Sequence, residues 1–248
     1  MDLEADGTPI ITSILIVAGS PDATSTDLTR ALARTHDVTI ACDGGLRLLA
    51  DAGLTPDIVV GDLDSATPED LRAVHLAGAS VLTFPVEKDE TDLDLALEHA
   101  RYISGSAGWV PRVTLTGTHG GRLDHELAIL GSCVRAHDLS PVIVEEGSVS
   151  RFITPEDGRT LITEPLERLP GSADHDPIGM TVSLIALGEP GVLSTTGLRW
   201  DLAQDTFAPL DSWGVSNIIE DAGATLDVHS GVFMLHLLTG ITGTQEPA

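Results

Sequence analysis

The chain has 248 residues, of which 42% are hydrophobic, and this is the composition of a globular protein rather than a disordered one. Its 38 acidic and 13 basic side chains give a formal net charge of −25, which argues against broad contact with nucleic acid or an anionic membrane, because both need a basic surface. Cys42 and Cys133 match neither a zinc site nor a disulfide framework. No apolar run approaches the roughly 18 residues of a membrane-spanning helix, and the acidic N-terminus lacks a signal peptide's basic region, so we expect a cytoplasmic protein.

The first part of the chain alternates between strand-like and helix-like segments. Short β-branched runs predict strands at 14–18, 38–42, 57–61, 80–84, 112–116 and 141–145. Helical spacing of apolar residues predicts helices at 46–53, 68–78, 93–103 and 123–137. This alternation predicts an α/β fold, with a three-layer domain around a mainly parallel six-stranded sheet over residues 1–147.

The pattern changes in the second part of the chain. Turn residues become frequent, and short strand-like runs follow at 181–187, 225–231 and 232–238, without a convincing helix. We therefore expect a C-terminal all-β, sandwich-like domain over residues 148–248. The irregular stretch 155–179 fits either an ordered crossover or a mobile loop.

Acidic residues and glycines follow the expected strands at their carboxyl ends. They are Gly19-Ser20, Asp43-Gly44, Asp62-Leu63-Asp64, the acidic stretch from Glu87 to Asp94, and the glycine-rich stretch 117–125. Because the carboxyl ends of parallel strands share one rim of a sheet, and ligands bind outside that rim in open α/β folds, we expect one site there.

Each stretch taken alone also has a structural interpretation. Asp43 before two glycines fits a turn and a helix cap. The acids between 87 and 94 fit the solvated start of a helix, where they suit the positive end of the dipole. The alternative is a cation site, in which bound metal offsets the repulsion between carboxylates. Acids at three strand ends together favour the cation site.

The spacing of the acids predicts which of them face the crevice. Asp62 and Asp64 are two apart in extended chain, so their side chains project from one side. Asp89 and Asp92 are three apart, with Asp89 the expected N-cap of a helix and Asp92 one turn into it. With Asp43, these four carboxylates suggest a Mg²⁺ site that also binds substrate phosphates, and the spacing leaves open whether one or both of Asp89 and Asp92 contact the metal.

Glycines and basic side chains supply candidates for phosphate binding. Backbone N–H groups at Gly120 and Gly121 precede a helix and suit phosphate oxygens. Arg122 is placed to clamp a phosphate in a bidentate manner, and Lys88, the only lysine, adds a point charge. The nucleotide-binding candidates are Gly19, Ser20, Gly44, Gly120 and Gly121.

These motifs resemble those of one known family. The series ACDGGLRLL, PDIVVGDLDS, EKDETDLDLAL and TGTHGGRLDHELAIL is similar in order and spacing to the thiamine pyrophosphokinases. GLRW (197–200) and GVSN (214–217) resemble the family's thiamine-binding β-domain. The resemblance implies transfer of diphosphate from ATP to thiamine, giving AMP and thiamine diphosphate, with Mg²⁺ as cofactor.

The resemblance also implies residue roles and an assembly. Asp43 would lie in the acidic crevice, Arg122 and Lys88 would stabilise phosphate charge, and Asp124 would orient the attacking hydroxyl or the thiamine. Trp200, Ser216 and Asn217 would form a thiamine pocket between subunits, which implies a homodimer. Without the resemblance, core packing is an equal interpretation of Trp200.

Two other functions fit the first domain. One is a diphosphokinase for another alcohol, such as a hydroxymethylpterin, and the GLRW and GVSN motifs favour thiamine over it. The other is a non-catalytic nucleotide or metal sensor on the same scaffold, which the loss of a metal-binding acid would favour, and none is lost.

Overall fold

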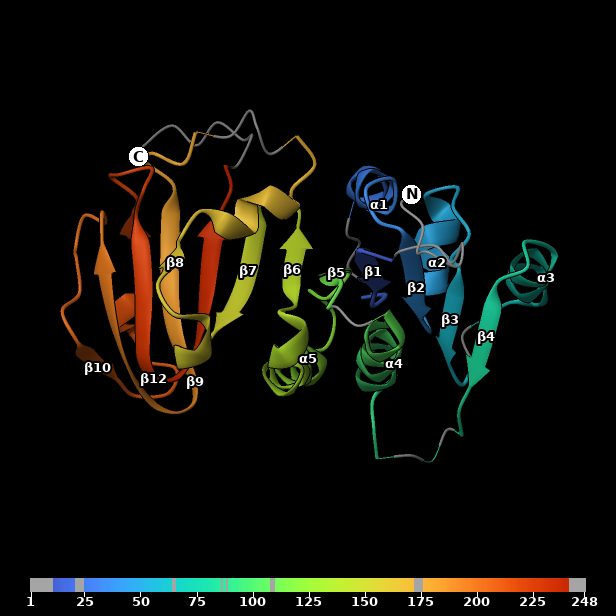
Figure 1. Ribbon diagram of the computed structural model, residues 1–248. Helices are drawn as coiled ribbons and strands as arrows, with labels where there is room; N and C mark the ends of the chain where they lie inside the picture. Colours follow the sequence, from blue (N-terminus) through green and yellow to red (C-terminus); the bar gives the residue numbers. More distant parts are fainter. Residues whose placement is uncertain are drawn as a thin grey trace. The chain divides into compact units, whose positions relative to one another are not determined.

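The computed structural model describes residues 11–20, 25–63, 66–85, 87, 89–107, 110–171 and 176–240, with only the backbone for 104–107. The chain divides into two compact units, Met1–Glu146 and Gly147–Ala248 (Figure 1). Among the described residues, no helix combines the length and apolar character that a bilayer span requires.

A parallel sheet organises the first unit. Its described strands run in the order β4-β3-β2-β1-β5-β6, and each neighbouring pair is parallel. The strands are β1 (Ser13–Val17), β2 (Val38–Cys42), β3 (Ile58–Gly61), β4 (Ser80–Thr83), β5 (Arg112–Thr116) and β6 (Val142–Glu145). The predicted α/β class and parallel sheet are confirmed.

The helices of this unit cover the sheet on two faces. They are α1 (Thr26–Ala33), α2 (Gly45–Asp51), α3 (Pro68–Leu76), α4 (Asp92–Ala107) and α5 (Leu123–Arg135), with a short 3₁₀ helix η1 (His137–Leu139) after the last. The chain moves from β1 to β4 in one direction and then crosses to β5 on the other side of β1. Right-handed crossovers therefore place α4 and α5 on the face opposite α1 and α2 (Figure 1). The two halves of the sheet meet between β1 and β5, which is the topological switch point.

The core of the unit follows from the strand sequences. Every residue of β1 is buried, and Leu49 of α2 and Ala96 of α4 pack on the sheet with no exposed surface. The continuous apolar runs that predicted buried strands have this environment because helices cover both faces.

Helix α1 was not expected from the sequence. Its sequence TDLTRALA mixes polar and apolar residues, and the helix buries only Thr29 and Leu32. Ser25 caps it, because the Ser25 side chain accepts hydrogen bonds from the backbone N–H groups of Asp27 and Leu28. The crossover between β1 and β2 requires an element here, and the cap defines its start.

The second unit is strand-rich, as predicted, and is built on one long antiparallel pair. The strands are β7 (Ser148–Ile153), β8 (Thr160–Leu161), β9 (Thr181–Thr196), β10 (Asp205–Phe207), β11 (Asn217–Ile218) and β12 (Thr225–Leu238). β12 lies between β9 and β7 and also pairs with β8, whereas β10 and β11 pair with the outer edge of β9.

Two expectations for this unit change in detail. The runs 225–231 and 232–238 form the single strand β12, with register shifts between Val228 and Val232 that accommodate the polar HSG sequence as a bulge. The described part also contains 3₁₀ helices at Pro155–Asp157 (η2), Glu164–Arg168 (η3) and Ser212–Gly214 (η5), where no helix was expected. As far as residue 171, the 155–179 stretch is an ordered crossover, since η2, β8 and η3 occupy it.

Candidate active site

A cavity opens at the switch point of the first unit. Its volume is about 470 Å³, and it is lined by the segments that follow β1, β2 and β5 and by the first turns of α4 and α5. The predicted site residues that it brings together are Gly19, Ser20, Asp43, Gly44, Asp92, Gly120, Arg122 and Asp124. This position is the one where open α/β sheets bind ligands.

Close backbone packing forms one wall of the cavity. A Cβ atom on Gly19 would lie 2.0 Å from the backbone nitrogen of Gly45, and one on Gly45 would lie 2.0 Å from the carbonyl oxygen of Val17. Only glycine fits at both positions, because side chains would collide with backbone. The segments after β1 and β2 thus touch directly, which leaves bare backbone facing the cavity.

Two carboxylates from different elements meet beside the end of β3. Gly61 has a φ of 150°, and the position of a Cβ atom on it would lie 3.4 Å from both Asp43 Cβ and Asp92 Cγ. Burial raises the pKa of the adjacent Cys42 thiol, and the charges of Asp92 and Asp43 raise it further. The end of β3 is therefore a region of negative potential.

The backbone is strained at this acidic edge. Asp43 has a φ of 35° and Leu63 has a φ of 63°, and both values lie in the left-handed region. Such conformations cost about 1–3 kcal/mol for a residue that is not glycine and are concentrated at functional sites. Asp62 lies between Gly61 and Leu63 and is half-buried, whereas Asp64 falls outside the described residues.

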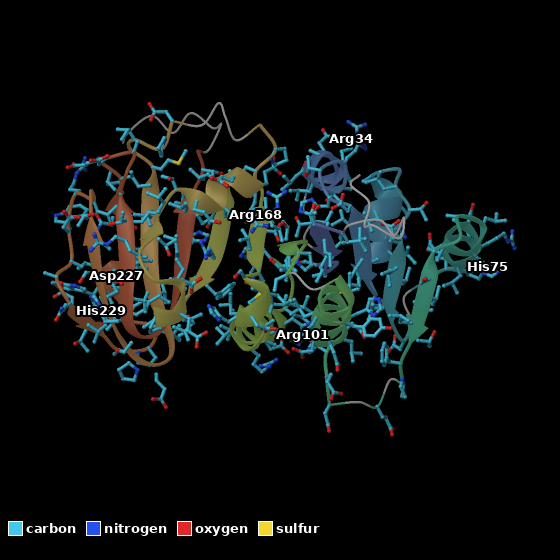
Figure 2. The ribbon with its side chains drawn as sticks, in the orientation of Figure 1. Arg34, His75, Arg101, Arg168, Asp227 and His229 are labelled. Carbon is cyan, nitrogen blue, oxygen red and sulfur yellow. The ribbon has the colours of Figure 1, made fainter. Side chains whose placement is uncertain are left out.

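The structure separates Asp89 from Asp92. Asp89 lines a different hollow of about 380 Å³, beside Asp94 and Arg101. Arg101, labelled in Figure 2, donates hydrogen bonds of 2.6 and 2.7 Å to Asp138. Asp89 is thus not among the residues that line the switch-point cavity.

The predicted cap of α4 was wrong by two residues. Thr91 caps this helix, since its Oγ1 accepts a hydrogen bond from the Asp94 N–H (3.1 Å) and its own N–H donates to Asp94 Oδ2 (3.2 Å). Asp94 also accepts a hydrogen bond from Arg135 (2.8 Å), and these partners lower its pKa although burial opposes them. Asp94 is thus a structural carboxylate, and Asp92 is the first residue of the helix.

Carboxylates and a serine hold the glycine loop, which we define as residues 117–121. The Thr118 N–H and Oγ1 donate to Glu145 Oε1, at 2.7 and 2.8 Å, and the Gly120 N–H donates to Glu126 Oε1 at 2.7 Å. Ser20 donates from its N–H to the Gly117 carbonyl (2.7 Å) and from its hydroxyl to the Gly120 carbonyl (2.8 Å). The Gly120 amide, expected to face phosphate, thus has a carboxylate partner in this state.

Arg122 and Asp124 form a bidentate ion pair at the start of α5. The distances are 3.1 Å from Arg122 Nε to Asp124 Oδ1 and 2.5 Å from Nη2 to Oδ2, and both side chains are exposed. The guanidinium lowers the pKa of Asp124 to about 2. Gly121 precedes this pair with a φ of 80°. Lys88 lies outside the described residues.

Four polar residues at the site were not among the predicted residues. Thr91, Thr118 and His125 line the cavity, and Glu145 lies behind Thr118. Glu145 is the last residue of β6, so the strand-end rule that selected Asp43 and Asp62 also applied to it.

The second unit holds the predicted thiamine-pocket residues in a compact arrangement. Asn217 is buried, and it fixes the Trp200 backbone by accepting from its N–H (3.2 Å) and donating to its carbonyl (2.7 Å). Trp200 as a whole is 59% exposed, and the Arg199 guanidinium lies 5.8 Å from the centroid of its ring. Ser216 precedes Asn217 with a φ of 63°. Core packing is therefore excluded for Trp200.

The carboxylates near the end of β3 supply oxygen ligands of the kind that Mg²⁺ requires. Within the described residues, no group of three or more His, Cys, Asp or Glu side chains is arranged as a metal site, and Asp64 lies outside them. Asp43 and Asp92 nevertheless supply hard oxygen donors in a negative region, with Asp62 adjacent in sequence to Gly61. Carboxylate oxygens of this kind, completed by water and substrate phosphates, suit Mg²⁺.

Comparison with known proteins identifies the family. The thiamin pyrophosphokinase catalytic-domain model matches residues 21–144, and that family's vitamin B1 binding domain matches residues 172–233. Thiamine pyrophosphokinase from Bacillus subtilis is 37% identical over 46% of this chain, and thiamine pyrophosphokinase 1 from Arabidopsis thaliana is 27% identical over 71% of it. The matched stretches span 51% and 62% of the lengths of these relatives.

Solved structures agree with the sequence matches. The Bacillus subtilis thiamine pyrophosphokinase structure aligns with a TM-score of 0.73 and 25% identity, covering 92% of this chain and 100% of that one. The Candida albicans enzyme shares the fold, with a TM-score of 0.72 at 13% identity over 92% of this chain and 90% of that one. The motifs, both family matches and the shared fold together show that this chain belongs to the thiamine pyrophosphokinase family.

Proposed function

We propose that this protein transfers the diphosphate group of ATP to the hydroxyl of thiamine, which gives AMP and thiamine diphosphate. The observation that carries the proposal is the switch-point cavity, which is lined by Asp43, Asp92 and the Arg122–Asp124 pair together with glycine backbone. Family membership supplies the substrates, and a cytoplasmic location belongs to the same proposal. Diphosphoryl transfer requires positioning and charge neutralisation more than covalent chemistry, and this cavity is built for both.

The glycine-lined wall is the proposed nucleotide site. At Gly19 and Gly44 the backbone is not screened by side chains, so a phosphate chain can approach it closely. Ser20 supports this wall through its two hydrogen bonds to the glycine loop. Gly120 and Gly121 complete the proposed nucleotide contacts from the opposite side.

The acidic edge is the proposed Mg²⁺ site, with Asp62, Asp64 and Asp92 as ligands and Asp43 beside them. Bound Mg²⁺ would supply charge neutralisation at the phosphate oxygens. We prefer Asp92 to Asp89 because only Asp92 lines the cavity.

Arg122 and Asp124 are the proposed acting pair during transfer. Arg122 presents a planar fork that can bind phosphate oxygens in a bidentate manner, and Lys88 is proposed to add a second positive charge. When Arg122 turns to phosphate, Asp124 is released to accept a hydrogen bond from the thiamine hydroxyl and orient it. Even at the ordinary aspartate pKa of about 3.9, a carboxylate is a weak base towards an alcohol, so this role is one of orientation before proton loss late in the reaction.

The proposed thiamine pocket uses the exposed face of Trp200. Asn217 holds the Trp200 backbone, and Ser216 directly precedes Asn217 in the sequence. An indole face attracts flat cationic rings, and thiamine carries a permanent positive charge. We propose that the pocket is completed in a homodimer.

The test is one incubation of the purified protein with thiamine, ATP and Mg²⁺, followed by chromatography. We expect AMP and thiamine diphosphate to appear together and to vanish with EDTA. The match of the vitamin B1 binding domain to residues 172–233 disfavours a pterin acceptor. AMP without thiamine diphosphate, or ATP binding without any turnover, would contradict the proposal.

A further inference from the structure

Glu145 is a buried carboxylate to which the proposed reaction gives no role. It ends β6 and is 7% exposed. A buried carboxylate is costly unless donors satisfy it. Two donors to it, the N–H and the hydroxyl of Thr118, belong to one residue of the glycine loop and contact the same oxygen, Oε1. The buried carboxylate thus holds both polar groups of that residue.

Thr118 stands between this carboxylate and the cavity. It is 4% exposed, yet it lines the cavity together with Gly117 and Gly120. The chain turns sharply at Gly117, whose φ is 70°, and a Cβ atom there would lie 3.1 Å from the Gly19 nitrogen. A shift of Thr118 would therefore move the glycine loop against Gly19 in the glycine-lined wall of the cavity.

The charge on Glu145 has a second neighbour on the same loop. His119 Nδ1 lies 3.7 Å from Glu145 Oε1, and its ring is half exposed. Hydrogen bonds to an ionised acceptor are shorter and stronger than neutral ones, which explains why a carboxylate, rather than an amide, suits this position.

We propose that Glu145 is a positioning residue for the transfer reaction: its buried carboxylate fixes Thr118 and thereby the part of the glycine loop that lines the cavity. The inference rests on the proposed function, because it assigns a role at the same site. It adds a residue from β6 to that site, and this residue acts through Thr118 without touching substrate.

The test compares Glu145→Gln, which keeps the shape but loses the charge, with Glu146→Gln, the same change at the exposed neighbouring residue. We expect Glu145→Gln to lower kcat on the order of 10-fold with KM for thiamine nearly unchanged, because misplacement of a supporting group acts on the reaction geometry. Glu146→Gln should match the wild type. Thr118→Val, which removes one donor, should lower kcat similarly, and the double variant should lose less than the product of the two single effects.

Amide hydrogen exchange at Thr118 gives a readout that does not need turnover. Faster exchange in folded Glu145→Gln than in Glu146→Gln supports the inference. A Glu145→Gln protein with kcat within about 2-fold of the wild type and unchanged Thr118 exchange overturns it. An inactive wild-type protein would contradict the proposed function instead, and the exchange comparison would still decide whether Glu145 holds the loop.

Discussion

Two clusters of charged side chains, one in each unit, differ in how their charges are arranged. In the second unit, Arg151 is 13% exposed and lies between Asp157 (2.9 Å) and Glu164, so opposite charges satisfy one another inside the fold. In the first unit, Asp43 and Asp92 bring like charges to the end of β3. Like charges gain little from each other, which agrees with the cationic ligand that the proposed function places there. The cluster around Arg151 is structural, whereas the cluster at the end of β3 is proposed to bind a cation.

Matched substitutions of Asp92 and Asp89 test the proposed cation-binding role of the cluster at the end of β3, and the largest effect is expected here. Asp92→Asn should lower turnover by at least about 100-fold, because it removes a negative charge from the proposed Mg²⁺ site. Asp89→Asn makes the same chemical change in the other hollow and should stay within about 3-fold of the wild type. Steady-state rates at saturating ATP and Mg²⁺ measure both. Equal losses of turnover in the two variants would contradict the assignment of Asp92, rather than Asp89, to the site.

Substitution of Arg151 tests whether its ion pairs with Asp157 and Glu164 stabilise the fold. Arg151→Met leaves two carboxylates without their shared partner, and we expect a loss of about 3 kcal/mol in the free energy of unfolding. The control is Arg159→Met, since Arg159 is 68% exposed and its guanidinium lies 4.0 Å from Asp227, which Figure 2 labels. That variant should change stability by less than about 0.5 kcal/mol. Urea unfolding followed by circular dichroism compares them, and similar midpoints for both would show that the buried arrangement contributes nothing.

A smaller effect is expected at the proposed thiamine pocket. Trp200→Ala should raise KM for thiamine about 10-fold, the value expected for a lost cation–π contact, and leave KM for ATP unchanged. Asn217→Ala should act in the same direction, because it frees the Trp200 backbone from two hydrogen bonds. Initial rates at varied thiamine provide the measurement. A change in KM for ATP alone would separate Trp200 from thiamine.

The smallest effect is a titration in the glycine loop. The Glu145 carboxylate raises the pKa of His119 above its ordinary value of 6.5, with burial opposing and Glu126 adding to the shift. The charged ring is thus favoured in the folded state, so its stabilising contribution is full below pH 6.5 and is lost as the pH rises through the raised pKa. Glu145→Gln should bring the pKa of His119 down, as NMR of the ring protons would show. An unchanged pKa would mean that Glu145 does not act on His119.

Much of the fold could be predicted from the sequence because its strands are buried on both sides. Runs such as ILIVA and DIVVG have no competing helical pattern, so the strands of the first unit and their parallel arrangement follow from them. Helix α1 could not be found in this way, because it buries two residues and depends on the Ser25 cap and the crossover for its place. The β12 bulge was missed for a similar reason, since its HSG sequence is typical of a turn.

The sequence predicted the edge of the sheet at which the site lies, but not which side chains contact one another there. The strand-end rule found Asp43 and Arg122, and the structure places both on one cavity. Spacing could not separate Asp89 from Asp92, because that depends on where the helix begins, and the Thr91–Asp94 cap sets its start at Asp92. Nor could the sequence show that Glu145 is buried while Glu146 is exposed, since two adjacent acids before a glycine are typical of a solvated turn.

Whether this cavity transfers a diphosphate group can be read from ³¹P NMR of a complete reaction with thiamine, ATP and Mg²⁺. We expect the ATP signals to be replaced by those of AMP and thiamine diphosphate in equal amounts. ADP together with thiamine monophosphate, or ATP signals that persist in the presence of thiamine and Mg²⁺, would contradict it.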